Sequence, residues 1–218
     1  MSEAPSMITA VHAMAERLAL AGFFTARRGG VSARSGRSIV IAAAGGGEGG
    51  AVPADATVVD LASGAFAGPR PAELELHLAI YRQRRDIGAV IRTSAPFTDA
   101  VASARRPLPP VLEELAQLAG PSVRVVDPAP PDAADTVRGA LAALRGRRAA
   151  LLARDGGMCL GRDLDEAFLC CQVLERGCQT FVEAQFLGGP KHLGLLEAHI
   201  FHQYYLRRYS RAWQRGDA

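Results

Sequence analysis

The segment GAVIRTSAPF, from Gly88 to Phe97, places a charged side chain and a hydroxyl group at the end of an apolar strand. Ala89–Arg92 has the composition of a buried strand, and the chain then turns toward a proline. The ends of strands in α/β proteins often carry the chemistry, because ligands bind in the crevice beyond them. Arg92, with Ser94 two residues further on, is therefore a candidate site residue.

A second candidate group lies just upstream, in a stretch with helical periodicity. Glu73 and His77 are four residues apart, so they share one face of the expected helix. Leu74, Leu78 and Tyr81 form an apolar stripe on the same helix, and such a stripe usually packs in a core. His77 could ligate a metal, but a helix histidine that is hydrogen-bonded to a backbone or carboxylate group is the commoner arrangement.

Two other patterns carry weaker signals. His199 and His202 are three residues apart near the C-terminus, but without a third partner they make a poor metal site. Gly45, Gly47 and Gly50 satisfy the spacing G-x-G-x-x-G, yet a strand follows them where a dinucleotide site needs a helix. A mobile glycine-rich loop over 43–50 is the better interpretation.

Short apolar strands alternate with helices along the rest of the chain. Helical spacing and capping residues predict helices near residues 8–21, 71–83, 96–104, 111–119, 132–144, 163–186 and 193–213. The predicted strands are a hairpin of 29–34 and 38–42, followed by 57–61, 89–92, 123–127 and 149–153. This alternation predicts one α/β domain over residues 1–218, with helices on both faces of a single sheet.

Composition limits the class of protein. The chain has 218 residues, 49% hydrophobic and 22% charged, which is typical of a folded globular domain. A net charge of +3 is mild and spread out, so no nucleic-acid partner is expected. No apolar run is long enough to cross a membrane, and no signal peptide is expected. The four cysteines have no C-x-x-C spacing and are expected to be buried free thiols in the cytoplasm.

Several segments together resemble the class II aldolase/adducin family, which includes sugar-phosphate aldolases, an epimerase, a dehydratase and some decarboxylases. They are GGVSAR (Gly29–Arg34), VVDLASGAFAGPRPAELELHLAIYRQRRDIGAVIRTSAPFTDAVA (Val58–Ala102), RPLPPVLEE (Arg106–Glu114) and ARDGGMCLGRDLDEAF (Ala153–Phe168). The resemblance covers nearly the whole chain. It implies a three-layer α/β/α domain with a mostly antiparallel or mixed central sheet.

The resemblance also implies where a divalent metal, usually zinc, is bound in the family. Its H-x-H histidines correspond to Arg92 and Ser94, its third histidine to Asp155, and its catalytic glutamate to Glu73. Only the glutamate is kept. Arginine offers no lone pair and a neutral serine hydroxyl is a poor zinc ligand, so no zinc or other cofactor is expected.

The phosphate-binding pattern of the family is weakened as well. The asparagine of its G-N-x-S segment is Gly30 here, although Gly29 and Ser32 remain, and hydroxyls after the second strand are replaced by alanines and glycines. Backbone amides can still bind anions. A sugar-phosphate substrate is therefore less expected here than for a typical member, and a small anionic ligand at Gly29, Gly30, Ser32, Arg92 and Ser94 is possible.

The family positions of Glu73 and Asp155 converge on the metal, so Arg92 is expected to lie between the two carboxylates as a salt-bridge triad. The favoured function is a non-catalytic or regulatory, ligand-binding relative. The alternative is a metal-independent lyase, a decarboxylase or an aldol-type enzyme for a small carboxylic or oxo acid. In that case Arg92 would hold the substrate and Glu73 or Asp155 would move the proton.

Assembly is a further expectation from the resemblance, because family members commonly form cyclic tetramers. The predicted C-terminal helical tail, about 193–214, is rich in aromatic and arginine residues, which are enriched at interfaces. A homotetramer is therefore expected.

Overall fold

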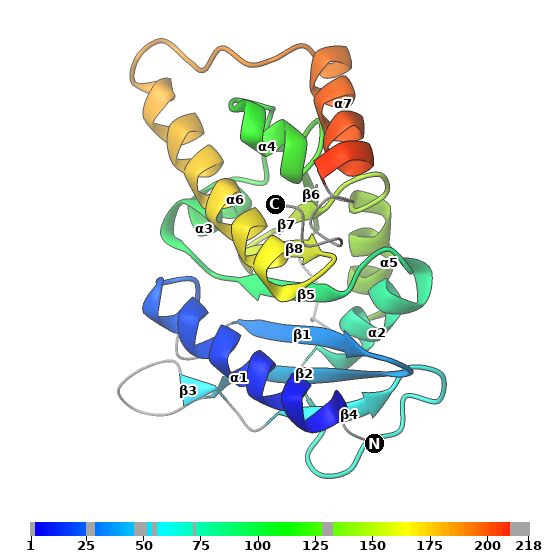
Figure 1. The fold of residues 1–218 in the computed structure, drawn as a ribbon. Helices are drawn as coiled ribbons and strands as arrows, with labels where there is room; N and C mark the ends of the chain where they lie inside the picture. Colours follow the sequence, from blue (N-terminus) through cyan, green and yellow to red (C-terminus); the bar gives the residue numbers. More distant parts are fainter. Residues whose placement is uncertain are drawn as a thin grey trace.

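The chain folds around one mixed sheet with helices on both faces (Figure 1). In this computed structural model the described residues are 3–24, 29–45, 52–53, 56–71, 73–127 and 133–209. The strands are β1 (Gly30–Ser35), β2 (Ser38–Gly45), β3 (Val52–Pro53), β4 (Thr57–Asp60), β5 (Ala89–Thr93), β6 (Arg124–Val126), β7 (Ala149–Leu152) and β8 (Gly157–Gly161).

The sheet has the strand order β3-β2-β1-β5-β8-β7-β6, and β4 also pairs with β2. Among the pairs in the described ranges, β6 and β7 run parallel and the others are antiparallel. The mostly antiparallel or mixed α/β sheet expected from the sequence is therefore confirmed.

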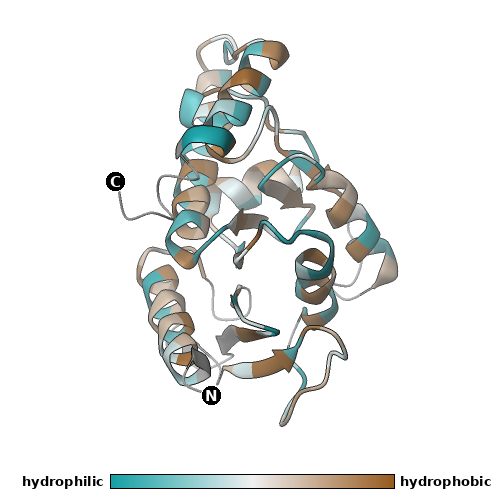
Figure 2. Cartoon of the chain, turned by 45° about the vertical axis from the view of Figure 1, so that its right-hand side comes forward, coloured by the Kyte–Doolittle hydropathy of each residue, from teal (hydrophilic) through white to brown (hydrophobic). Residues whose placement is uncertain are grey.

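Two hydrophobic cores lie on opposite faces of this sheet. The helices are α1 (Glu3–Leu20), α2 (Leu74–Gln83), α3 (Pro96–Ser103), α4 (Glu113–Leu118), α5 (Ala134–Ala143), α6 (Leu164–Gln185) and α7 (Leu195–Tyr204). The buried side chains of α1, α3, α4 and α6 belong to one core, and those of α2 and α5 belong to the other. Hydrophilic and hydrophobic residues alternate along these helices, as expected for elements with one buried face (Figure 2).

Successive side chains of a strand point to opposite faces of the sheet, and this decides which residues face α2. In β5, Ala89 and Ile91 enter the core under α1 and α6, whereas Val90 enters the core under α2. Arg92 therefore points toward α2. In β1 the same alternation directs Ser32 and Arg34 toward α2, since Val31 and Ala33 enter the opposite core.

The sequence did not predict β8, whose residues GMCLG begin and end with glycine. Close packing requires glycine at Gly161, where the neighbour is backbone, and favours it at Gly157, where the neighbours are side chains. A Cβ on Gly161 would lie 2.3 Å from the backbone nitrogen of Ala167, and one on Gly157 would lie 2.9 Å from the Leu174 side chain. Glycines inside a strand mark such close approaches, but in a sequence they resemble a loop.

Two predicted boundaries are also corrected. Helix α2 begins at Leu74 rather than near Pro71, because Glu73 adopts a left-handed conformation with φ 62°. The predicted loop over 43–50 begins later, since β2 continues to Gly45 and residues 46–51 lie outside the described ranges.

At the C-terminus, α7 ends at Tyr204 and is followed by a π-helical turn, Tyr205–Tyr209. The remainder of the predicted last helix lies outside the described ranges. In the described part of the chain, no helix combines the length and the apolar composition that crossing a membrane requires.

Candidate functional site

Arg92 lies near the end of β5, between Gly30 of β1 and Met158 of β8 in the sheet register. Its side chain is only 6% exposed. A buried guanidinium stays charged, so it requires carboxylates or carbonyls around it.

Two carboxylates meet this requirement. One terminal nitrogen of Arg92, Nη1, forms an ion pair with Oε1 of Glu73. The other, Nη2, pairs with Oδ1 of Asp155 and donates to the backbone carbonyl of Asp155 at 3.1 Å. Glu73 is buried, whereas the Asp155 side chain is 30% exposed. The structure therefore brings together the three residues that the sequence placed in one salt-bridge triad.

Local backbone geometry positions the Glu73 carboxylate. Glu73 is the N-cap residue of α2 and has φ 62° and ψ 20°, a left-handed conformation that is uncommon for a residue with a side chain. Its carbonyl accepts the backbone N–H of His77 at 3.1 Å, which joins it to the first turn of the helix. Strained backbone of this kind costs of order 1–3 kcal/mol and is concentrated at functional sites.

Asp155 is held by a tight turn between β7 and β8. Its neighbours Arg154 and Gly156 both have positive φ angles, 67° and 82°. A Cβ on Gly156 would lie 2.0 Å from the carbonyl oxygen of Thr93. Only glycine allows this turn to pack against the end of β5, and that packing brings Asp155 to Arg92.

A buried hydrogen-bond network lies behind Glu73. Oγ of Ser32 is 2.7 Å from Nδ1 of His77 and 2.9 Å from the hydroxyl of Tyr81, which also donates to the Ser32 carbonyl. His77 is thus a buried, hydrogen-bonded histidine, as the sequence favoured, but its partner is a serine hydroxyl rather than a backbone or carboxylate group. Its Nε2 lies 4.0 Å from Oε2 of Glu73 and has no hydrogen-bond partner in the described part of the chain.

Burial lowers the pKa of His77 to about 4, from an ordinary value of 6.5. The unfolded chain therefore binds a proton between these two pH values and the folded chain does not, so stability falls as pH decreases through this range. We expect the titration of His77 to lower the free energy of unfolding by about 2 kcal/mol between pH 7 and pH 5.

Urea unfolding of the wild type and His77→Gln at both pH values measures this cost. The quantity compared is the pH-dependent difference within each protein, so the constant cost of the substitution cancels. The variant should lose about 2 kcal/mol less stability on acidification than the wild type. An equal loss in both proteins would show that His77 does not titrate between folded and unfolded states.

Ser94 and Gly29, which were also candidate ligand-binding residues, contact groups outside the triad. The hydroxyl of Ser94 donates to Oδ2 of Asp99 at 2.7 Å. Gly29 lies against Phe24, since a Cβ on Gly29 would be 2.4 Å from that ring. Gly30 borders the triad, because a Cβ there would lie 3.7 Å from Oε2 of Glu73. Of the predicted ligand-binding residues, only Gly30 and Arg92 are thus shown next to the carboxylates.

Sequence reasoning missed Glu175, which supports the loop after β5. From the middle of α6, its carboxylate accepts the backbone N–H groups of Phe97 and Thr98 at 2.9 and 2.7 Å, and the Thr98 hydroxyl at 2.7 Å. It thereby caps α3 and fixes the chain just beyond Arg92. A cap supplied by a residue 77 positions away leaves no local sequence pattern.

A second buried ion pair was missed as well. Nη1 of Arg148 lies 2.5 Å from Oε1 of Glu166, and the same oxygen accepts the Tyr205 hydroxyl at 2.9 Å. Burial acts to raise the pKa of Glu166, but Arg148, the backbone N–H of Arg162 and Tyr205 outweigh burial and lower it. This cluster joins the C-terminal turn to the start of α6, and its partners are too far apart in sequence to be predicted.

The divalent metal implied by the family resemblance does not fit these residues. A guanidinium lies between the two carboxylates, and it has no lone pair to offer. The Ser94 hydroxyl is already bonded to Asp99. Nowhere in the described ranges do three or more His, Cys, Asp or Glu side chains form a group suited to a metal ion.

Comparison with known proteins defines the class. A family model described as "Class II Aldolase and Adducin N-terminal domain" matches residues 9–182. The chain therefore belongs to the class II aldolase and adducin family, as its sequence segments and sheet predicted.

Curated proteins that are similar to this chain in sequence are named as aldolases. The chain is 34% identical over 167 residues to a 5-methylthioribulose-1-phosphate/5-deoxyribulose-1-phosphate aldolase of Rhodospirillum rubrum, covering 76% of this chain and 75% of that protein. It is also 34% identical over 146 residues to a 5-deoxy-D-ribulose 1-phosphate aldolase of Bacillus thuringiensis serovar kurstaki, covering 65% and 67%.

Among solved structures, an L-fuculose 1-phosphate aldolase superposes with a TM-score of 0.82 over 92% of this chain and 96% of that one. The sequence identity of this pair is 24%, so the likeness supports the fold alone.

Proposed function

We propose that this protein is a non-catalytic, regulatory member of the class II aldolase and adducin family, in which Arg92 replaces the metal as counter-ion. The observation that carries the proposal is the pairing of Arg92 with both Glu73 and Asp155. The cation that pairs with these carboxylates is covalently part of the chain. It therefore offers no open coordination position at which a substrate carbonyl could be polarised.

The charges of the triad also restrict what the site can bind. Two carboxylates surround one guanidinium, and His77 adds no charge at neutral pH because burial lowers its pKa. The group carries a net charge of −1, so an approaching anion meets repulsion while the triad is closed. A regulatory anion must displace Asp155, whose 30% exposed side chain is the less enclosed of the two carboxylates.

A specific observation favours the second candidate, a metal-independent lyase for a small carboxylic or oxo acid. Glu73 is buried, has a strained backbone and lies 4.0 Å from an imidazole nitrogen that has no hydrogen-bond partner in the described part of the chain. If a substrate carboxylate replaced Asp155 on Arg92, Glu73 would be placed to exchange a proton with the bound acid.

Both candidates exclude zinc-dependent aldol cleavage, and an activity assay tests this shared expectation. Purified protein supplied with zinc and 5-deoxyribulose 1-phosphate should release no dihydroxyacetone phosphate above the background, with the Rhodospirillum rubrum relative as positive control. Zinc-dependent cleavage by this protein would contradict the proposal.

Small oxo acids and aromatic acids test the second candidate. A ligand that binds the folded state raises the melting temperature. Turnover of such an acid, together with a melting-temperature increase that Arg92→Met removes, would establish the lyase in place of the non-catalytic relative. Stabilisation without turnover would support the regulatory function.

We also propose that the chain forms a homo-oligomer and is cytoplasmic. Exposed apolar side chains on α7, Leu196, Ile200 and Tyr204, support an assembly surface, and sedimentation as a monomer would contradict it.

The cytoplasmic location is supported by four buried free cysteines, Cys159, Cys170, Cys171 and Cys178.

A further inference from the structure

A separate hollow of about 290 Å³ lies at the turn between β1 and β2. Four arginines line it, Arg34, Arg37, Arg82 and Arg85, and no carboxylate is among its lining residues. Gly30, beside the triad, and Arg34, in the hollow, are at opposite ends of β1. The hollow is therefore distinct from the Glu73–Arg92–Asp155 site.

Arg34 and Arg82 are fixed in place by neutral groups. Nη2 of Arg34 donates to the carbonyl of Tyr81 at 2.8 Å, and its guanidinium lies 5.2 Å from the centre of the Tyr81 ring. Arg82 donates to the carbonyls of Leu61 and Ala62 at 2.7 and 3.1 Å. Carbonyls hold these side chains without cancelling their charge, so both guanidiniums are positioned before any ligand arrives.

Arg37 and Arg85 add two further positive charges at the exposed rim of the hollow. Both are exposed and form no ion pair with a carboxylate in the described part of the chain. The nearby carboxylate of Asp60 is already hydrogen-bonded to its own turn. The hydrogen bond from the backbone of Ser63 is the largest cause that lowers the pKa of Asp60, and Arg37 ranks last among the causes. The Asp60 carboxylate also accepts the Ser63 hydroxyl at 2.7 Å.

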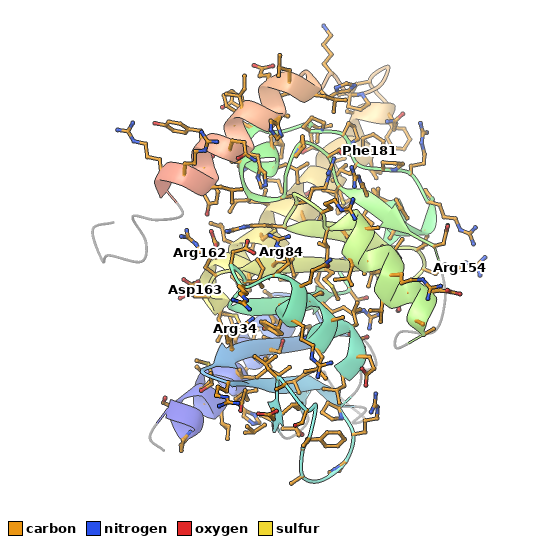
Figure 3. All side chains as sticks on the ribbon, turned by 90° about the vertical axis from the view of Figure 1, so that its right-hand side faces the viewer. Arg34, Arg84, Arg154, Arg162, Asp163 and Phe181 are labelled. Atoms are coloured by element: carbon orange, nitrogen blue, oxygen red, sulfur yellow. The ribbon has the colours of Figure 1, made fainter. Side chains whose placement is uncertain are left out.

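The surrounding surface is also rich in arginine. Figure 3 shows Arg84 and Arg162 on the same side of the molecule as Arg34. Arg84 is neutralised by Asp86, at 2.8 Å, and Arg162 lies 3.6 Å from Glu166. Arg84 and Arg162 thus have carboxylate partners, whereas no carboxylate is among the residues that line the hollow with its four arginines.

We propose that this arginine hollow binds a diphosphate group, either as free pyrophosphate or at the end of a nucleoside diphosphate. Guanidinium groups bind phosphate oxygens through paired N–H donors, and several of them can share one diphosphate. The volume suits a small, highly charged ligand, since pockets for drug-sized molecules begin near 300 Å³. This site is independent of the proposed function of the triad.

Calorimetric titration of the 218-residue protein with pyrophosphate, and separately with ADP, tests the proposal. The key variants are Arg37→Gln and Arg85→Gln, because neither side chain has a hydrogen bond or an ion pair to lose within the described ranges. Arg106→Gln is the matched control, because it removes another exposed arginine, beyond α3 and outside the hollow.

We expect saturable binding by the wild type, about tenfold weaker binding in each rim variant, and unchanged binding in Arg106→Gln. The affinity should also fall as salt is raised. Tighter binding of ADP than of pyrophosphate would assign the ligand to nucleotides, and the reverse would assign it to free pyrophosphate.

Absence of saturable binding of either probe to the wild type would overturn the proposal. The same holds if Arg106→Gln weakens binding as much as the rim variants do, because the interaction would then reflect net charge alone. Binding that survives both rim substitutions but disappears in Arg92→Met would place the anion at the triad instead.

Discussion

Replacement of Arg92 by methionine is expected to destabilise the protein by about 3–5 kcal/mol, because Glu73 and Asp155 then lose their counter-ion. Glu73 is only 7% exposed, so its charge cannot be fully solvated by water. The free energy of unfolding from urea titration, at neutral pH, measures the effect. Methionine keeps most of the volume of the arginine stem, so the lost charge dominates the result.

A matched substitution at the surface provides the control. Arg138 pairs with Asp135, but both side chains are more than two-thirds exposed, so Arg138→Met should change the unfolding free energy by less than about 0.5 kcal/mol. The triple variant Glu73→Gln, Arg92→Met, Asp155→Asn should recover most of the stability lost in Arg92→Met, since it removes all three charges together. If Arg92→Met costs no more than Arg138→Met, the triad does not neutralise buried charge.

The second large effect is expected from restoring imidazole groups. The variant Arg92→His, Ser94→His, Asp155→His places three histidines where the family resemblance puts its metal ligands, and Glu73 remains beside them. We expect it to bind about one zinc ion per chain, a stoichiometry to be measured by elemental analysis after dialysis. The wild type should bind none under the same conditions.

The variant Arg92→Met, Ser94→His, Asp155→His is the matched control, since it removes the guanidinium but supplies only two imidazoles. It should hold zinc much more weakly than the three-histidine variant. If the three-histidine variant acquires no zinc, the correspondence between these positions and the family metal site is wrong.

Most of the fold could be predicted because most of its helices and strands have a local sequence signal. The buried strand ending in Arg92 and the long helix α6 both show hydrophobic patterns that match their period, and α6 has Asp163 as an N-cap that accepts the Glu166 N–H at 2.8 Å. The missed strand β8 shows the limit. Its Gly157 packs against the distant Leu174 and its Gly161 against the backbone at the start of α6, and hydrophobic periodicity reports neither contact.

The candidate site likewise contains residues that could be predicted from the sequence and residues that could not. Arg92, Glu73 and Asp155 could be placed together because the resemblance supplied a common reference point for three distant segments. The orientation of Ser94 toward Asp99, the cap from Glu175 and the Arg148–Glu166–Tyr205 cluster could not be predicted. The cap and the cluster depend on tertiary packing between residues that no local pattern links. Ser94 and Asp99 are only five residues apart, but their bond depends on how the loop after β5 is held.

The replacement of the metal by Arg92 is tested by measuring the metal content of the purified wild-type protein, prepared without chelators in zinc-supplemented medium. If Arg92 has replaced the metal, elemental analysis should find well under about 0.1 divalent ion per chain, and a chelator should leave the melting temperature unchanged. About one tightly bound ion per chain, removed by the chelator together with aldolase activity, would contradict the account.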